Sequence, residues 1–131
     1  MNVILDTDVL VDLAHGKAEW LEELIKRPGR NRIIVPTAVV AEYWGAAELD
    51  DKENLRKAEK LFKSFVRQEL TEEIAKLVGT LNRHKDYPAG ASFVDLVVAS
   101  TAITMEARLA TRNKKHFAKI PGLDFFEEVG D

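Results

Sequence analysis

The first eight residues contain the feature that most limits how this chain can fold. Val3, Ile4 and Leu5 form an unbroken run of β-favouring apolar residues that stops at Asp6. Such a run is typical of a strand buried on both faces, as in a parallel sheet. Ligands of open α/β sheets bind outside the carboxyl ends of the strands, so an acid at this place is a candidate metal ligand or nucleophile. Capping of a following helix by Asp6 or Thr7 explains this stretch equally well when it is considered alone.

Short apolar runs alternate with segments of helical spacing along the rest of the chain. Further strands are predicted at 33–35, 67–70, 109–110 and 123–126. Helices are predicted at 18–26, 38–49, 53–66, 71–81 and 93–106, and a loop is predicted at 86–90. This alternation predicts a single α/β domain over residues 1–131. We expect a three-layer α/β/α sandwich around a central parallel sheet of four to five short strands.

Composition narrows the chemistry that the chain can use. No cysteine is present, so any metal must be held by oxygen or imidazole, which favours a hard ion such as Mg²⁺ or Mn²⁺. The 19 Lys and Arg residues against 22 Asp and Glu residues give a net charge of −3, which argues against broad nonspecific nucleic-acid binding but not against a nucleic-acid enzyme. Neither a membrane span nor a secretion signal is recognisable, so a cytoplasmic protein without a membrane partner is expected.

Three acidic residues are predicted to meet at one edge of the sheet. Asp6 follows the first strand, Glu42 lies in the helix after the second, and Asp95 lies in the first turn of an almost wholly apolar helix. Each also has a structural interpretation: Ser92 and Asp95 have the spacing of a capping box, and Glu42 could be a solvated helix residue. Their combination favours a divalent cation, because uncompensated carboxylates are costly to bury.

Four stretches in this order resemble the PIN-domain family, and among its members the VapC-like toxins of toxin–antitoxin pairs. They are Val3-Ile4-Leu5-Asp6-Thr7-Asp8-Val9-Leu10, Val35-Pro36-Thr37 through Ala41-Glu42, Asp95-Leu96-Val97-Val98-Ala99-Ser100-Thr101-Ala102, and Leu109-Ala110-Thr111-Arg112-Asn113-Lys114-Lys115-His116-Phe117. The resemblance covers nearly the whole chain. It implies an α/β/α fold and a ribonuclease dependent on Mg²⁺ or Mn²⁺. It also implies a homodimer that a small antitoxin inhibits.

The resemblance also assigns roles to individual residues. Asp6, Glu42 and Asp95 correspond to the catalytic, metal-binding acids of the family. Supporting hydrogen bonds are implied for Thr7, Asp8, Thr111 and Asn113. Many members carry one more acid where this chain has His116, so a second metal site is in doubt. His116 itself could be a ligand, a phosphate contact or an ordinary surface residue, and the last is favoured because a basic loop is usually solvated.

The chemistry expected of such a site follows from charge. A metal held by Asp6 and Asp95 would polarise the phosphate and orient or activate a water, while Glu42 would complete the metal shell through water or assist proton removal. A basic cluster beside the site is predicted to contact the RNA backbone. Its members are Arg112, Lys114, Lys115 and Lys119, and His116 is a further candidate.

Two alternatives from other functional classes remain open. Asp6-Thr7-Asp8 resembles the Asp-x-Asp start of haloacid-dehalogenase-type phosphatases, in which the first Asp is a nucleophile. That motif normally continues with Gly-Thr, whereas Val9 and Leu10 follow here. The other alternative is an inert PIN fold that acts only as an RNA- or protein-binding module.

Overall fold

A single parallel sheet forms the centre of the molecule. The computed structural model describes residues 1–27, 29–84 and 91–127, so the loop predicted at 86–90 lies outside the described residues. Its strands are β1 (Asn2–Leu5), β2 (Arg32–Pro36), β3 (Val66–Gln68), β4 (Arg108–Ala110) and β5 (Asp124–Phe125). They lie in the order β3-β2-β1-β4-β5, and all four pairings are parallel. The predicted parallel sheet is therefore confirmed.

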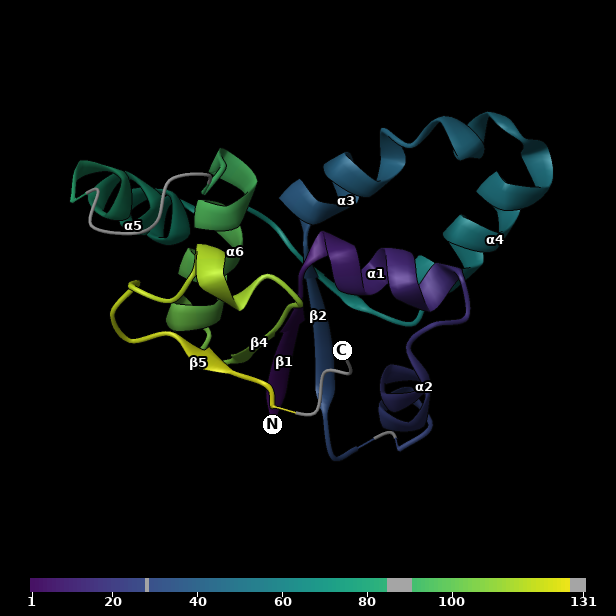
Figure 1. Cartoon of the computed structure of the whole chain (residues 1–131), viewed down its shortest axis with the longest axis horizontal. Coiled ribbons are helices and arrows are strands. Elements are labelled where there is room, and N and C mark those ends of the chain that lie inside the picture. The colour runs from purple at the N-terminus through teal and green to yellow at the C-terminus, as the bar shows by residue number, and fades with distance from the viewer. Residues whose placement is uncertain (28, 85–90, 128–131) are drawn as a thin grey trace.

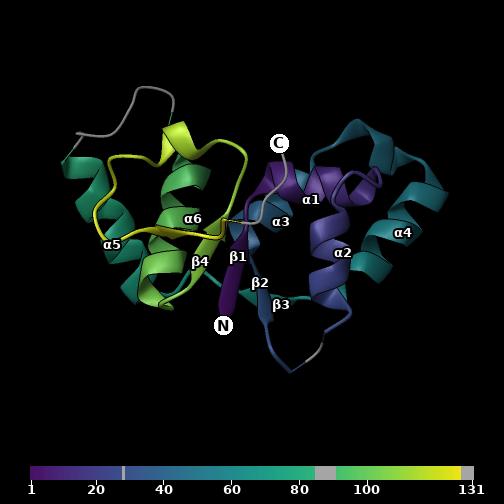
Figure 2. The same cartoon turned by 60° about the horizontal axis from the view of Figure 1, so that its bottom comes forward.

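Helices cover both faces of this sheet. They are α1 (Thr7–Ala14), α2 (Glu19–Ile25), α3 (Thr37–Trp44), α4 (Lys52–Phe62), α5 (Glu72–Arg83) and α6 (Phe93–Thr104). Two 3-10 turns, η1 (Ala47–Asp50) and η2 (Lys114–His116), complete the order. Helices α5 and α6 lie on one side of the sheet and α1, α2 and α4 on the other (Figures 1 and 2). The predicted three-layer α/β/α sandwich is thus the observed architecture.

Two predicted helices end earlier than their apolar spacing indicated. The segment predicted as one helix over 38–49 is α3 followed by η1, with Gly45 as the C-terminal cap of α3. The segment predicted over 53–66 stops at Phe62, and Val66 already belongs to β3. Phe65, between these elements, is buried like the apolar residues of α4, so the hydrophobic spacing continues past the real helix end.

The core is built around the most apolar stretches of the sequence. Val3, Ile4 and Leu5 of β1 have no exposed surface, as expected for the middle strand of a covered parallel sheet. Helix α6 is buried from Leu96 through Ala102 and contacts β1, β2 and β4 as well as α3 and α5. A helix that is apolar all round is buried on several sides, and α6 meets this expectation.

The path of the chain creates a switch point between β1 and β4. From β1 the chain moves outward through β2 to β3 with its helices on one face, and it then returns through α5 and α6 to β4 on the other face. Leu5 pairs with Ala110, so β1 and β4 end side by side. Crevices for ligands form where connections leave neighbouring strands in opposite directions. This edge is therefore the place at which the fold favours a binding site.

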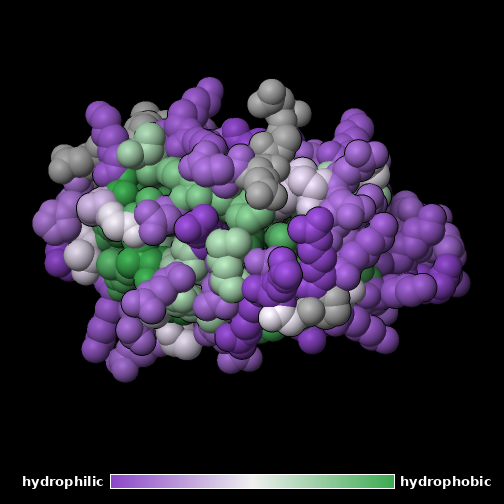
Figure 3. Space-filling view, turned by 90° about the horizontal axis from the view of Figure 1, so that it is seen from below, coloured by the Kyte–Doolittle hydropathy of each residue, from purple (hydrophilic) through white to green (hydrophobic). Residues whose placement is uncertain are grey.

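The surface at the amino ends of the strands is apolar on one side and polar on the other. Figure 3 views the molecule from the side of the N-terminus and shows apolar residues reaching the surface on its left, where α5 and α6 lie, while polar residues dominate on the right. Among the helices in the described ranges, none is long and apolar enough to cross a membrane. The polar residues considered next lie at the other, carboxyl edge.

Candidate active site

Asp6 is the central residue of the carboxyl edge. It directly follows β1, is only 5% exposed, and donates its backbone N–H to the carbonyl oxygen of Ala110 over 3.1 Å. One carboxylate oxygen, Oδ1, accepts the backbone N–H of Thr7 at 2.8 Å and so caps α1, while Oδ2 accepts the hydroxyl of Thr111 at 2.8 Å. The capping interpretation is therefore correct, and the second oxygen ties β1 to the end of β4.

Burial and neighbouring charge make the ionised form of Asp6 unfavourable. Desolvation is the largest cause and the Asp8 carboxylate the second, and together they raise the pKa of Asp6 from 3.8 to about 6. The carboxylate of Asp95 adds to this rise, while the hydrogen bonds from Thr111 and Thr7 oppose it. Asp6 and Asp95 are 89 positions apart in the sequence, but in the fold they are close enough for the charge of Asp95 to raise the pKa of Asp6. A carboxyl group with a raised pKa in such a place is a candidate for function.

Asp8 belongs to the same edge but is held by a different partner. Its Oδ2 accepts the backbone N–H of Arg112 at 3.2 Å, and burial raises its pKa. Its Oδ1 is buried and has no hydrogen-bond partner among the described residues, and the same holds for the hydroxyl of Thr7. Buried polar atoms without partners are unusual in native proteins and point to a missing ligand or water.

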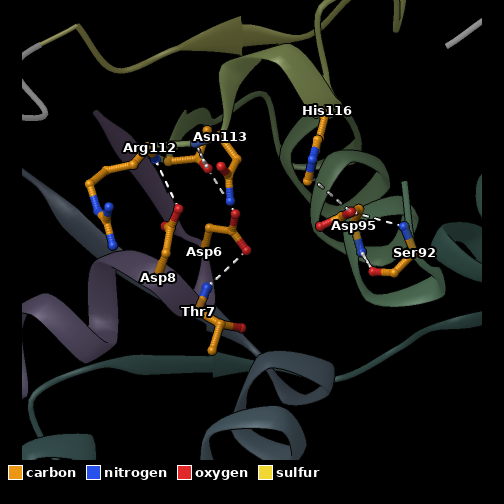
Figure 4. A network of polar contacts seen from close by, with 9 residues as sticks. Asp6, Thr7, Asp8, Ser92, Asp95, Arg112, Asn113 and His116 are labelled. Carbon is orange, nitrogen blue, oxygen red and sulfur yellow. Dashed lines mark hydrogen bonds and ion pairs between the residues drawn. The ribbon is translucent and has the colours of Figure 1, made fainter. Parts of the chain in front are cut away.

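Asp95 lies in the first turn of α6 and forms the predicted capping box. Its backbone N–H donates to the Ser92 hydroxyl at 3.1 Å, and its Oδ2 accepts the backbone N–H of Ser92 at 2.9 Å. The same Oδ2 lies 3.7 Å from Nδ1 of His116. Figure 4 shows that the other oxygen of Asp95 points toward the side on which Asp6 lies. Oδ2 thus stabilises the start of α6, and Oδ1 can bind a ligand.

Glu42 is placed less favourably than the other two acids. It lies in α3, is exposed, and makes no side-chain hydrogen bond or ion pair with any residue that the structure describes. Its charge is not among the causes that shift the pKa of Asp6. Helix α3 nevertheless contacts both α1 and α6, the helices that carry Asp8 and Asp95. The catalytic and metal-binding role expected of Glu42 therefore stays a prediction.

The basic residues after β4 are mostly engaged with acids of this chain. Arg112 pairs with Asp12, with 2.7 Å between Nε and Oδ2 and 3.3 Å between Nη2 and Oδ1. Lys114 pairs with Glu127 at 3.1 Å and lies over the ring of Phe125. Lys115 is exposed and has no ion pair within the described ranges.

The remaining supporting residues complete a small network below this basic loop. The Thr111 hydroxyl, which donates to Asp6, accepts the backbone N–H of Asn113 at 3.0 Å. Figure 4 shows this network joining β1, α1 and the segment after β4. Of the four residues predicted to support the acids by hydrogen bonds, Thr7 and Thr111 bond Asp6 directly and Asn113 bonds Thr111. Asp8 instead bonds the backbone of Arg112, and its charge disfavours the ionised form of Asp6.

The donor atoms at this edge fit a hard divalent cation. Carboxylate oxygens of Asp6 and Asp95 lie on the same edge, and the partnerless Oδ1 of Asp8 adds a third source of negative charge. Within residues 1–27, 29–84 and 91–127, however, no three or more His, Asp or Glu side chains are arranged to hold a metal ion by themselves. Mg²⁺ tolerates this arrangement, since it commonly binds through one or two carboxylates and keeps several waters.

Asp12 is the residue of this network that the sequence prediction missed. It pairs with the guanidinium of Arg112, whose backbone N–H is bound by Asp8. Asp8 and Asp12 are four residues apart in α1 and therefore share one face of that helix. This spacing was the available signal, but it does not identify a partner 100 positions away.

Comparisons with known proteins show the family and the fold. A family model described as PIN domain matches residues 3–123. Ribonuclease VapC19 of Mycobacterium tuberculosis is 32% identical over 124 residues, which cover 92% of this chain and 95% of that relative.

Solved structures show the same likeness. One is a chain of VapBC2 from Rickettsia felis bound to a DNA fragment from their promoter, with a TM-score of 0.79, 27% identity and coverage of 96% of this chain and 98% of that chain. Another is a chain of DNA-bound VapBC from Salmonella typhimurium, with a TM-score of 0.81, 20% identity and coverage of 96% and 97%. At the lower identity the likeness shows the fold alone.

Proposed function

This chain belongs to the PIN-domain family, and on that premise we propose that it is a VapC-like endoribonuclease that hydrolyses RNA phosphodiester bonds with Mg²⁺ or Mn²⁺. The family match agrees with the resemblance seen in the sequence. The relative from Mycobacterium tuberculosis, of which the alignment covers 95%, is named a ribonuclease. The observation that carries the proposal is the buried Asp6. Burial raises its pKa most, and the charges of Asp8 and Asp95 at the switch point of the sheet add to this rise.

The three acids and the two threonines would have different roles in the reaction. When bound, a divalent cation supplies Lewis-acid polarisation of the scissile phosphate. Asp6 and Asp95 would hold it, and Glu42 would complete its shell through water or take a proton from the attacking water. Thr7 and Thr111 fix the two oxygens of Asp6, so the carboxylate enters the reaction already oriented. Such preorganisation lowers the barrier because little rearrangement is needed in the transition state.

Removing the metal tests the proposal directly. We expect the purified chain to cleave single-stranded RNA with Mg²⁺ or Mn²⁺, to lose that activity in excess chelator, and to regain it when the metal is restored. The control is the Asp6→Asn protein purified in the same way. Equal cleavage by both proteins would indicate a contaminating nuclease, and the alternative of an RNA- or protein-binding module would then be favoured.

Lys115 is the member of the basic cluster best placed to contact RNA. We propose that Arg112, Lys114, Lys115 and His116 line the path of the RNA. In the described part of the chain, Lys115 and Lys119 are the members of the cluster without an ion pair, and Lys115 lies directly beside His116 in η2. Replacing Lys115 by alanine should weaken RNA binding and lower the slope of log affinity against log salt by about 0.7, the value for one phosphate contact on a single strand.

The measurement is fluorescence anisotropy with labelled single-stranded RNA at several salt concentrations, in an Asp6→Asn background that prevents cleavage. Lys26→Ala is the control, because Lys26 is an exposed lysine that follows α2, away from η2 (Figure 1), and pairs with Glu23 of that helix at 3.7 Å. An unchanged slope for Lys115→Ala, or an equal change for Lys26→Ala, would remove Lys115 from the RNA path.

A protein partner is part of the proposed function. The similar solved structures include a toxin–antitoxin complex from Klebsiella pneumoniae and the VapBC2 complex from Rickettsia felis, of which one chain is 27% identical and matches 96% of this chain. We therefore propose that this chain is the toxin of such a pair, that it binds a small antitoxin, and that it forms a homodimer. Co-expression with the product of the adjacent reading frame, followed by purification of the complex, tests the antitoxin directly.

The phosphatase alternative finds no support in these comparisons. The family model that matches residues 3–123 is a PIN domain, and the similar proteins include ribonuclease VapC19 and a chain of VapBC2. Both oxygens of Asp6 are engaged in hydrogen bonds with Thr7 and Thr111, which suits a fixed ligand better than a nucleophile that must attack.

A further inference from the structure

His116 contacts the acid that the proposed function places at the metal. Its Nδ1 lies 3.7 Å from Oδ2 of Asp95, and its side chain is only 30% exposed. The contact lies within ion-pair range, although it is longer than a formed hydrogen bond. This contact distinguishes His116 from an ordinary surface residue, because a fully solvated histidine would not lie partly buried against a carboxylate.

The two oxygens of Asp95 have different surroundings. Oδ2 accepts the backbone N–H of Ser92 and faces His116, so both contacts fall on the same atom. Oδ1 accepts no hydrogen bond from any residue that the structure describes. Figure 4 shows His116 above the carboxylate, Ser92 to its right and Asp6 to its left. The side chain is thus contacted through Oδ2, and its free oxygen is directed toward the other acid.

The position of His116 is itself fixed by the fold. Within η2 its backbone N–H donates to the carbonyl oxygen of Asn113 at 2.9 Å, and the next residue, Phe117, is 1% exposed in the core. The imidazole consequently approaches Asp95 from an anchored turn. A direct role as a metal ligand is less well supported, since His116 belongs to no group of three ligating side chains in the described residues.

We propose that His116 is a positioning residue that, together with the backbone of Ser92, holds Oδ2 of Asp95 and so directs Oδ1 toward the cation shared with Asp6. This inference rests on the proposed function. Outer partners of ligating carboxylates fix ligand orientation, and their loss typically weakens metal affinity by about 10- to 100-fold. His116 would therefore act on the affinity for the metal through Asp95 and not by touching the metal itself.

The test measures Mn²⁺ binding to the RNA-free chain by electron paramagnetic resonance of the unbound ion. We expect His116→Ala to weaken Mn²⁺ binding by about 10- to 100-fold without a change in the thermal midpoint of the metal-free protein. His116→Asn should restore most of the affinity, because its side-chain amide can place an N–H where Nδ1 of the imidazole lies. His15→Ala is the matched control, since His15 contacts Glu48 at 3.5 Å at the far end of α1.

Each outcome separates this inference from the function on which it rests. Wild-type affinity in His116→Ala, or an equal loss in the alanine and asparagine variants, would overturn the positioning role while leaving the metal site intact. An electron spin echo signal from nitrogen bound directly to Mn²⁺ in the wild type, absent in His116→Ala, would also overturn it, because His116 would then be a ligand. A wild-type chain that binds no Mn²⁺ would overturn the metal-dependent function and this inference together.

Discussion

The Asp6→Asn protein should cleave RNA at least about 1000-fold more slowly than the wild type, because a metal ligand contributes several kcal/mol to the stabilisation of the transition state. In the absence of metal the same variant should be harder to unfold at neutral pH. Function and stability therefore change in opposite directions at this residue. The reason is that Asp6 carries a charge in a place where burial and two other carboxylates disfavour it.

The pH dependence of stability gives this prediction its sign. The pKa of Asp6 is raised to about 6 in the folded chain, so between about pH 4 and pH 6 the folded state binds a proton that the unfolded state has lost. The free energy of unfolding of the wild type should therefore fall by about 2–3 kcal/mol across this window and stay lower at higher pH. Asparagine cannot ionise, so the variant should lack this fall.

Asparagine also preserves part of the local structure. Asn is as good an N-cap as Asp, so its side-chain oxygen can still accept the N–H of Thr7. The hydroxyl of Thr111 loses its carboxylate acceptor, which costs about 1 kcal/mol. The net gain in stability expected at pH 7 is accordingly about 1–2 kcal/mol.

Urea unfolding in chelator from pH 4 to pH 8, paired with RNA cleavage in Mn²⁺, measures both effects. Asp51→Asn is the matched control, because Asp51 caps α4 by accepting the N–H of Asn54 at 3.0 Å but is exposed. It should change neither stability nor cleavage. An Asp6→Asn protein that is less stable than the wild type at pH 7 would contradict the electrostatic account, and one that cleaves normally would contradict the function.

Much of the fold was predictable because the decisive signals are local. Runs such as 3–5 and 33–35 are buried strands, and such strands need apolar side chains on both faces. The helix ends were less predictable. Apolar spacing continues from α4 into Phe65, so only the tertiary pairing of Val66 with Ile34 marks where the strand begins. Spacing alone does not reveal a boundary that a neighbouring strand imposes.

Sequence reasoning placed Asp6 and Asp95 at one end of the sheet, where the structure also has them, but it did not predict the partners of the residues around them. Asp6 and Asp95 were each open to a structural and a functional interpretation, and in both the structural one is present as a helix cap. The two interpretations are compatible, because a carboxylate has two oxygens and a cap occupies only one side. The pairs of Arg112 with Asp12 and Lys114 with Glu127 depend on how distant elements pack.

Replacing Phe117 by alanine should have the largest effect on stability of any change near the site. Phe117 is 1% exposed and the largest of the fully buried side chains, so its truncation should lower the free energy of unfolding by about 3–5 kcal/mol. It also follows η2 directly and anchors the turn that carries His116. We therefore expect the loss to extend to the carboxylate edge, with weaker Mn²⁺ binding at temperatures where the variant is still folded.

Phe65→Ala separates general destabilisation from this local effect. Phe65 is 5% exposed, packs edge-on against Phe62 and directly precedes β3, at the end of the sheet opposite the acids, so its truncation should cost a similar free energy of unfolding. Equal weakening of Mn²⁺ binding in both variants would mean that stability alone controls the site. Both variants are measured by unfolding in urea and by titration with Mn²⁺. Weaker Mn²⁺ binding in Phe117→Ala only would mean that Phe117 fixes the position of η2, and that η2 in turn fixes the position of Asp95.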